Sequence, residues 1–137
     1  MAHSFPPLSV RVVEDLDDAA QSTADLLGLC GHAVRVARSG RDALGAAAGE
    51  MPDVVLLDSG LPGMDGWEVA RRMRDRAAGK RPYIVAVTGF GADGDRRRSA
   101  DAGIDLHLVK PADPRTLIAL LGRVRACRAG QPAGAGA

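Results

Sequence analysis

Four apolar runs of the sequence end at residues that are suited to handling a phosphoryl group. The runs are Val10–Val13, Val54–Leu57, Tyr83–Val87 and Leu106–Val109, and they are followed by Glu14-Asp15, Asp58, Thr88 and Lys110 respectively. Short apolar runs separated by helical patterns are typical of parallel strands, whose carboxyl ends meet at one edge of a sheet. We therefore expect three carboxylates, one hydroxyl and one ammonium to converge at that edge.

The three carboxylates could hold a metal ion. Mg²⁺ prefers oxygen ligands and is usually bound through one or two carboxylates together with phosphate oxygens and water. Glu14, Asp15 and Asp58 would repel one another strongly if they were unpaired, so a cation among them is favoured. Glu14 and Asp15 alone are also compatible with solvated loop acids, and Asp58 strengthens the interpretation as a metal site.

Asp58 is the best candidate for a nucleophile, because carboxylates can form aspartyl-phosphate intermediates and Asp58 follows the most apolar run. Lys110 could neutralise a phosphoryl oxygen as a point charge on a flexible stem. Thr88 could donate a hydroxyl hydrogen bond at the same edge. The alternatives for these residues are a turn former, a solvated loop lysine and an ordinary strand threonine.

The pattern along the chain predicts alternating strands and helices that position these groups. Strands are expected at Ser9–Val13, Ala33–Ala37, Val54–Leu57, Tyr83–Val87 and Leu106–Val109, and helices at Asp17–Leu29, Gly40–Ala48, Trp67–Arg76, Asp93–Ala102 and Pro114–Cys127. Five such units with short loops predict an α/β fold, a doubly wound parallel sheet between two layers of helices.

Composition limits the class of protein. The 137 residues fit one domain, and the net charge of +1 argues against a nucleic-acid-binding domain. Cys30 and Cys127 lack metal-ligand spacing, no stretch is long and apolar enough to cross a membrane, and Met1–Pro7 has no signal-peptide core. We expect a cytoplasmic protein that does not bind membranes. The 18 cationic residues include only two lysines, Lys80 and Lys110, so each of these raises the question of a specific role.

The motifs together resemble the receiver domain of bacterial two-component response regulators. The matching stretches are Val12–Asp15, Val54–Gly66, Val85–Gly89 and Leu108–Pro111, in chain order within about Leu8 to Ala126. The resemblance implies a flavodoxin-like fold in which five parallel strands have the order 2-1-3-4-5 and are accompanied by five helices.

The resemblance also implies roles for the site residues. Asp58 would accept a phosphoryl group from the phosphohistidine of a histidine kinase. Mg²⁺ would be bound by Asp15, Asp58 and the backbone carbonyl of Gly60, with Glu14 acting through water. The protein would then be a signalling receiver that catalyses only its own phosphorylation and dephosphorylation.

A conformational switch follows from the same resemblance. Lys110 and Thr88 would hold the phosphoryl oxygens, and movement of Thr88 toward the phosphate would trigger the change that alters the face made by the fourth helix, fifth strand and fifth helix. The family usually has Tyr or Phe three residues before the lysine, where this chain has His107. His107 could change rotamer as the switch partner, or could be an ordinary strand residue.

We expect residues 8–128 to form the receiver, residues 1–7 an N-terminal extension and residues 129–137 a disordered tail, without a fused output domain. The expected partners are a sensor or hybrid histidine kinase and a histidine phosphotransfer protein, and the expected state is a monomer or weak dimer.

Two alternatives remain on the sequence. The first is a receiver-like interaction module that is never phosphorylated, against which Asp58, Thr88 and Lys110 argue. The second is a haloacid-dehalogenase-like phosphatase that uses Asp15 in an Asp-x-Asp motif with Asp17. The second alternative leaves Asp58 without a role and lacks a late acidic pair.

Overall fold

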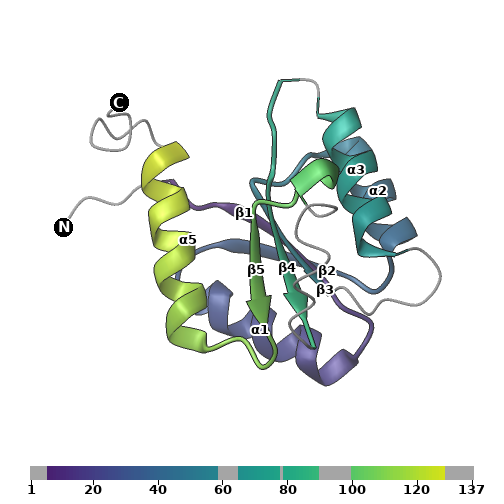
Figure 1. Ribbon diagram of the computed structural model, residues 1–137. Helices are drawn as coiled ribbons and strands as arrows, with labels where there is room; N and C mark the ends of the chain where they lie inside the picture. The colour runs from purple at the N-terminus through teal and green to yellow at the C-terminus, as the bar shows by residue number, and fades with distance from the viewer. Residues whose placement is uncertain (1–5, 59–64, 78, 90–99, 129–137) are drawn as a thin grey trace.

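The computed structural model describes residues 6–58, 65–77, 79–89 and 100–128, and Figure 1 shows how its elements are arranged. The strands are β1 (Ser9–Val13), β2 (Ala33–Ala37), β3 (Val54–Asp58), β4 (Tyr83–Thr88) and β5 (Leu106–Val109). The helices are α1 (Asp17–Leu29), α2 (Gly40–Gly49), α3 (Gly66–Arg76) and α5 (Pro114–Arg128). Residues 100–102 are helical as expected, whereas residues 93–99 of the expected helix Asp93–Ala102 lie outside the described ranges.

The five strands form one parallel sheet in the order β2-β1-β3-β4-β5. This is the predicted strand order, and the fold is flavodoxin-like. In Figure 1, α1 and α5 lie on one side of the sheet and α2 and α3 on the other. None of the described helices is long and apolar enough to cross a membrane. The crossovers place the carboxyl ends of all five strands at one edge, which is where open α/β sheets carry their sites.

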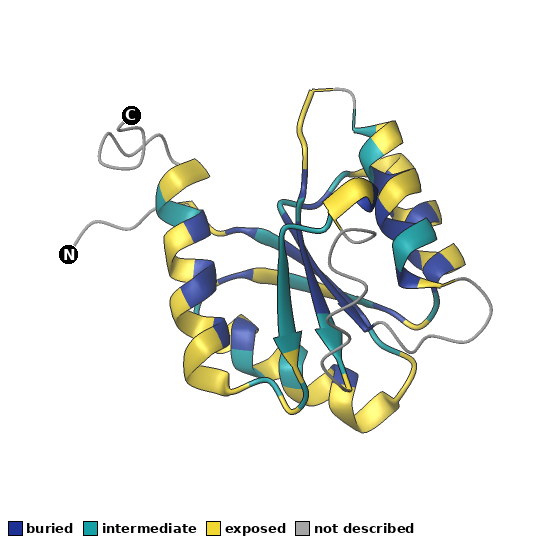
Figure 2. Cartoon of the chain, in the orientation of Figure 1, coloured by how far each residue is buried: buried dark blue, intermediate teal, exposed yellow. Residues whose placement is uncertain are grey.

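The centre of the sheet is buried on both faces, and Figure 2 shows the dark strands between helices whose outer surfaces are exposed. All five residues of β3 are buried. One apolar cluster packs β1 and β3 against α2 and α3, and a second packs them against α1 and α5. This double coverage explains why β3 is a continuous apolar run rather than an alternating one.

Helix boundaries follow from capping residues. Ser39 Oγ accepts a hydrogen bond of 3.0 Å from the Asp42 amide and caps α2, which begins at Gly40 as predicted. Asp113 Oδ1 accepts one of 2.9 Å from the Arg115 amide at the start of α5. Asp65 Oδ1 accepts one of 2.8 Å from the Glu68 amide, so that α3 begins one residue earlier than the sequence predicted.

Two strands are one residue longer than the sequence predicted. Asp58 pairs with Val87, and Thr88 pairs with Val109, so both chemical residues belong to the sheet rather than to the loops that follow. The backbone ladder therefore fixes their positions.

Candidate functional site

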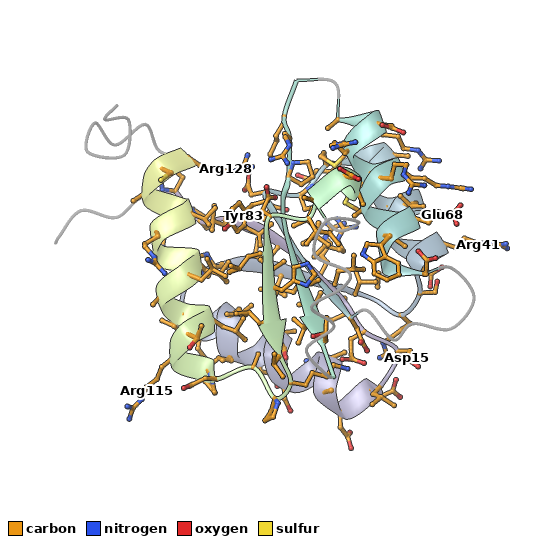
Figure 3. All side chains as sticks on the ribbon, viewed as in Figure 1. Asp15, Arg41, Glu68, Tyr83, Arg115 and Arg128 are labelled. Atoms are coloured by element: carbon orange, nitrogen blue, oxygen red, sulfur yellow. The ribbon has the colours of Figure 1, made fainter. Side chains whose placement is uncertain are left out.

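Three acidic side chains meet at the carboxyl edge of the sheet, as predicted. Glu14, Asp15 and Asp58 each offer a carboxylate oxygen, and these oxygens lie within 4.8 Å of one another. Asp15 is labelled in Figure 3 at the end toward which the strand arrows point, and Tyr83 and Arg128 lie toward the opposite end. The cluster joins the end of β1 to the end of β3.

Backbone contacts orient the first carboxylate. The Glu14 amide donates a hydrogen bond of 3.0 Å to the carbonyl of Ala37 at the end of β2. The Glu14 Oε2 atom in turn accepts a hydrogen bond of 3.3 Å from the Leu16 amide. These contacts turn the Glu14 side chain over the end of β1, while Asp15 remains exposed.

Asp58 is the buried member of the cluster and is paired with Lys110. The Asp58 side chain is only 7% exposed, and its Oδ1 atom lies 2.9 Å from the Nζ atom of Lys110. Lys110 follows β5, and its amide donates a hydrogen bond of 2.7 Å to the Thr88 carbonyl. The peptide bond between Lys110 and Pro111 is cis. The position of Lys110 after β5 therefore places its ammonium in direct contact with Asp58, the most buried of the three carboxylates.

Burial and the neighbouring charges shift the pKa values of Glu14 and Lys110. Burial, followed by the hydrogen bond with Asp58, raises the pKa of Glu14 above its usual value. Burial would lower the pKa of Lys110, but the hydrogen bond to Asp58 and the nearby acids outweigh this effect and raise the pKa. Three carboxylates share one ammonium, so the site attracts a further cation.

The donor set fits Mg²⁺. Two ligands of one Mg²⁺ ion at its usual bond length of about 2.1 Å lie at most about 4.2 Å apart. The three acidic oxygens lie within 4.8 Å of one another, which is close to this limit. Direct binding by two carboxylates and binding through water by the third satisfies the geometry. The expected fourth ligand, the carbonyl of Gly60, lies outside the described residues.

The two predicted switch residues occupy one face of the sheet. Thr88 pairs with Val109 and Ala86 pairs with His107, so the side chains of Thr88 and His107 both project toward the α2 and α3 side. His107 is half-buried, and its Nε2 atom is shielded from solvent. This placement is compatible with the switch role predicted from the sequence.

A cleft of about 510 Å³ extends from the site between α1 and α5. Glu14, Asp58 and Lys110 lie at its polar end. Its apolar walls include Leu16 and Ala19 from the start of α1 and Ala112 from the segment after Pro111. The sequence did not identify the wall contributed by the segment before α5, because that contact depends on tertiary packing.

Comparisons with known proteins agree with this geometry. The family model for the response regulator receiver domain matches residues 10–122. The chain is 33% identical over 116 residues to the response regulator PleD of Caulobacter vibrioides, covering 85% of this chain and 25% of PleD. It is 32% identical over 105 residues to the polar-differentiation response regulator DivK of Brucella anthropi, covering 77% of this chain and 85% of DivK.

A solved structure is similar over most of the fold. The receiver domain of a sensor histidine kinase from Pseudomonas aeruginosa, which has magnesium coordinated in its active-site cleft, superposes with a TM-score of 0.77 at 28% identity. The match covers 88% of this chain and 98% of that domain. The match of the family model to most of the chain, together with the predicted strand order, shows that the protein belongs to the response regulator receiver domain family of two-component signal transduction.

Proposed function

We propose that this receiver domain accepts a phosphoryl group on Asp58 from the phosphohistidine of a histidine kinase. The observation that carries the proposal is the contact between the buried Asp58 carboxylate and the Lys110 ammonium beside two further acids. A nucleophilic carboxylate, a fixed positive charge and a set of metal ligands are the groups that phosphoryl transfer requires.

The proposed reaction is a displacement at phosphorus. An oxygen of Asp58 forms a bond to phosphorus, the bond between phosphorus and the histidine nitrogen breaks, and the imidazole leaves with the electron pair. Lys110 holds a phosphoryl oxygen, and Thr88 donates a hydrogen bond to another. The product is an aspartyl phosphate, which water can hydrolyse or which a second histidine can accept.

Mg²⁺ is the proposed cofactor. Asp15 and Asp58 would hold it directly with the carbonyl of Gly60, and Glu14 would act through water. When bound, it neutralises the negative charge that accumulates on the phosphoryl oxygens. The relative from Pseudomonas aeruginosa that carries magnesium in its cleft supports this assignment.

We further propose that phosphorylation moves Thr88 and His107 and alters the face formed by the fourth helix, β5 and α5. That face would bind a partner, or the phosphoryl group would pass on to a histidine phosphotransfer protein. The functional unit would be residues 8–128, which we expect in the cytoplasm as a monomer or weak dimer. The chain spans a quarter of the length of PleD, so the activities of that longer protein are not transferred to it.

A small phosphodonor tests the assignment. The purified protein is incubated with Mg²⁺ and acetyl phosphate, and intact mass spectrometry records an added phosphoryl group. We expect the wild type to gain this mass, and Asp58→Asn and samples with EDTA to lose it. Asp18→Asn, which alters an exposed acid at the start of α1 outside the cluster, is the matched control and should label normally.

Other outcomes would redirect the assignment. Labelling that persists in Asp58→Asn and disappears in Asp15→Asn would favour the phosphatase-like alternative. A wild type that gains no mass from either acetyl phosphate or a phosphorylated kinase core would favour the interaction module that is never phosphorylated.

A further inference from the structure

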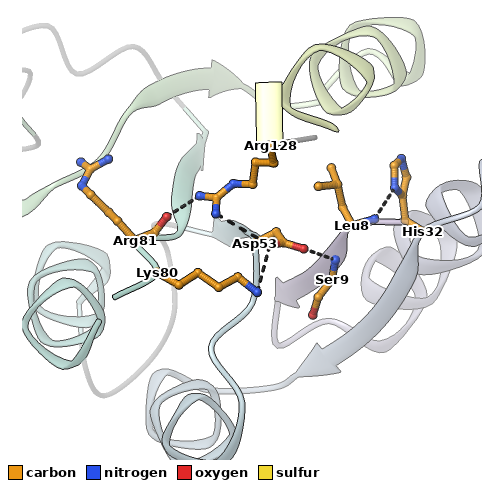
Figure 4. A network of polar contacts seen from close by, with 7 residues as sticks. All are labelled: Leu8, Ser9, His32, Asp53, Lys80, Arg81 and Arg128. Atoms are coloured by element: carbon orange, nitrogen blue, oxygen red, sulfur yellow. Dashed lines mark hydrogen bonds and ion pairs between the residues drawn. The ribbon is translucent and has the colours of Figure 1, made fainter. Parts of the chain in front are cut away.

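The two lysines of the chain pair with acidic residues at opposite ends of β3. Lys110 pairs with Asp58, the last residue of that strand, and Lys80 pairs with Asp53, the residue just before it. The proposed function uses the first pair and leaves the second without a role. Figure 4 shows that the second pair belongs to a network that includes Ser9 and Arg128. Ser9 begins β1 and Asp53 precedes β3, so this network lies at the amino edge of the sheet.

Asp53 is the centre of this network. Its Oδ2 atom accepts a hydrogen bond of 2.8 Å from the Ser9 amide at the start of β1. Its Oδ1 atom lies 2.9 Å from Lys80 Nζ and 3.7 Å from Arg128 Nη1. The Asp53 side chain is 17% exposed, whereas the side chains of Lys80 and Arg128 are 45% and 29% exposed, so the carboxylate is the shielded member of each pair.

The contacts with Asp53 outweigh the cost of its burial. Burial alone would raise the pKa of this carboxyl group. The Ser9 amide, the Lys80 ammonium and the Arg128 charge act in the other direction, and the pKa falls below its usual value. Asp53 is therefore held in its charged form by three separate parts of the chain.

The last turn of α5 is tied to the sheet through this centre. Arg128, the final residue of the helix, contacts both the Asp53 carboxylate and the carbonyl of Arg81. One turn earlier, Arg125 Nε donates a hydrogen bond of 3.0 Å to the Pro6 carbonyl, just before β1. A small pocket of about 130 Å³ lies between these groups. The carboxyl end of α5 is thus held against the segment that enters β1.

Helix α5 is consequently connected to both ends of β3. Its amino end follows the Lys110-Pro111 segment, which contacts Asp58, and its carboxyl end contacts Asp53. We propose that Asp53 anchors the carboxyl end of α5, so that a change at Asp58 displaces the amino end of the helix and leaves its last turn in place. The displacement part of this proposal rests on the proposed phosphorylation of Asp58, and the anchor part does not.

Hydrogen exchange of the full chain tests the anchor. The variant Asp53→Asn keeps an oxygen that can accept from the Ser9 amide and removes the charge that holds Lys80 and Arg128. The matched control is Asp105→Asn. Asp105 is also 17% exposed, lies 3.1 Å from Arg81 Nη2 and accepts a hydrogen bond of 2.8 Å from the Ile84 amide. It differs in that its ion pair is with Arg81 and not with α5.

Without phosphodonor, we expect the amides of residues 124–128 to exchange about tenfold faster in Asp53→Asn than in the wild type. The reason is that this variant loses the ion pair between Asp53 and Arg128, which holds the last turn of α5 against the sheet. In Asp105→Asn these amides should exchange at the wild-type rate. An unchanged rate in Asp53→Asn, or an equal increase in both variants, would overturn the anchor. If Asp53→Asn does not fold by circular dichroism, Arg128→Gln, which removes the same contact from the helix side, replaces it with the same expected result.

The second measurement adds acetyl phosphate and Mg²⁺ and records the phosphoryl mass of each sample. In the phosphorylated wild type, exchange should change near residues 110–116 and remain constant at residues 124–128. In phosphorylated Asp53→Asn, the change should extend to residues 124–128. A change at the last turn of the phosphorylated wild type would contradict the proposed anchoring. Absence of the phosphoryl mass in every sample would instead be a failure of the proposed function, and the first measurement would still decide the anchor.

Discussion

At the scale of single residues, the excess of negative charge is the property that defines the site. Glu14, Asp15 and Asp58 bring three carboxylates together beside the Lys110 ammonium, which pairs with Asp58. Burial, and then the hydrogen bond with Asp58, raises the pKa of Glu14. A divalent cation would remove the repulsion that remains. The site should therefore bind Mg²⁺ before any phosphoryl group arrives.

Thermal unfolding checks this expectation. At a Mg²⁺ concentration about tenfold above its Kd, binding to the folded state alone stabilises it by about 1.4 kcal/mol, and the Tm of the wild type should rise accordingly. Asp15→Asn should lose this Mg²⁺-dependent rise, whereas Asp18→Asn should retain it. An equal rise in all three proteins would show that Mg²⁺ binds elsewhere.

Another charged residue, Arg11, is buried in the sheet. It lies on β1 between Arg35 and Val55, is 2% exposed, and has no hydrogen-bond partner for Nε or Nη1 within the described part of the chain. Burial, then the charge of Arg35, lowers its pKa, against the opposing effect of Glu50. Transfer of a guanidinium from water to the protein interior costs solvation free energy, and an apolar side chain at the same position would not incur this cost.

We expect Arg11→Met to raise the free energy of unfolding by about 1 kcal/mol, measured by urea denaturation, because an unbranched apolar side chain can fill the same space. Arg35→Met, at the exposed neighbouring position, should change it by less than about 0.5 kcal/mol. A loss of about 1 kcal/mol or more in Arg11→Met would mean that the guanidinium has a stabilising partner.

At the scale of elements, the turn between α1 and β2 contributes a group that titrates near neutral pH. His32 is 8% exposed, and its Nδ1 atom accepts a hydrogen bond of 3.4 Å from the Leu8 amide. Burial and the nearby charge of Arg125 lower the pKa of His32 below its usual value of 6.5. The folded state therefore favours neutral His32, and protonation would remove the acceptor that holds the start of β1.

Because the folded pKa is the lower one, this stabilisation is present above the unfolded pKa and is lost as the pH falls through the folded pKa. Urea denaturation between about pH 5 and pH 8 should show the free energy of unfolding of the wild type decreasing toward the acid side. His32→Asn keeps an acceptor for Leu8 and cannot titrate, so its slope should be smaller. Equal slopes in both proteins would assign the effect to another group.

The elements also show how far the sequence could predict the structure. The alternation of short apolar runs with helical patterns is a local signal, and it predicted the strands, most helix boundaries and the convergence of Glu14, Asp15, Asp58 and Lys110. The burial of Arg11 was not predicted, because the run Val10–Val13 was read as apolar in spite of the arginine within it. Its neighbours on β2 and β3 are distant in sequence.

At the scale of the whole molecule, the two edges of the sheet have different chemistry. The carboxyl edge carries the acidic cluster, and the amino edge carries cations arranged around Asp53. The sequence predicted the first edge because strand ends converge in any parallel sheet. It did not predict the second, since the contact of Arg128 with Asp53 depends on how α5 crosses the sheet, although the rarity of lysine did mark Lys80.

The phosphorylation of Asp58 is the central claim, and identifying the modified residue tests it most directly. The protein is labelled by a phosphorylated histidine kinase core with Mg²⁺, the acyl phosphate is reduced with borohydride, and the peptides are sequenced by mass spectrometry. Reduction converts a phosphorylated aspartate to homoserine. We predict homoserine at position 58 and unmodified aspartate at position 15. Homoserine at position 15, or at neither position in protein that carries the phosphoryl mass, would contradict the account.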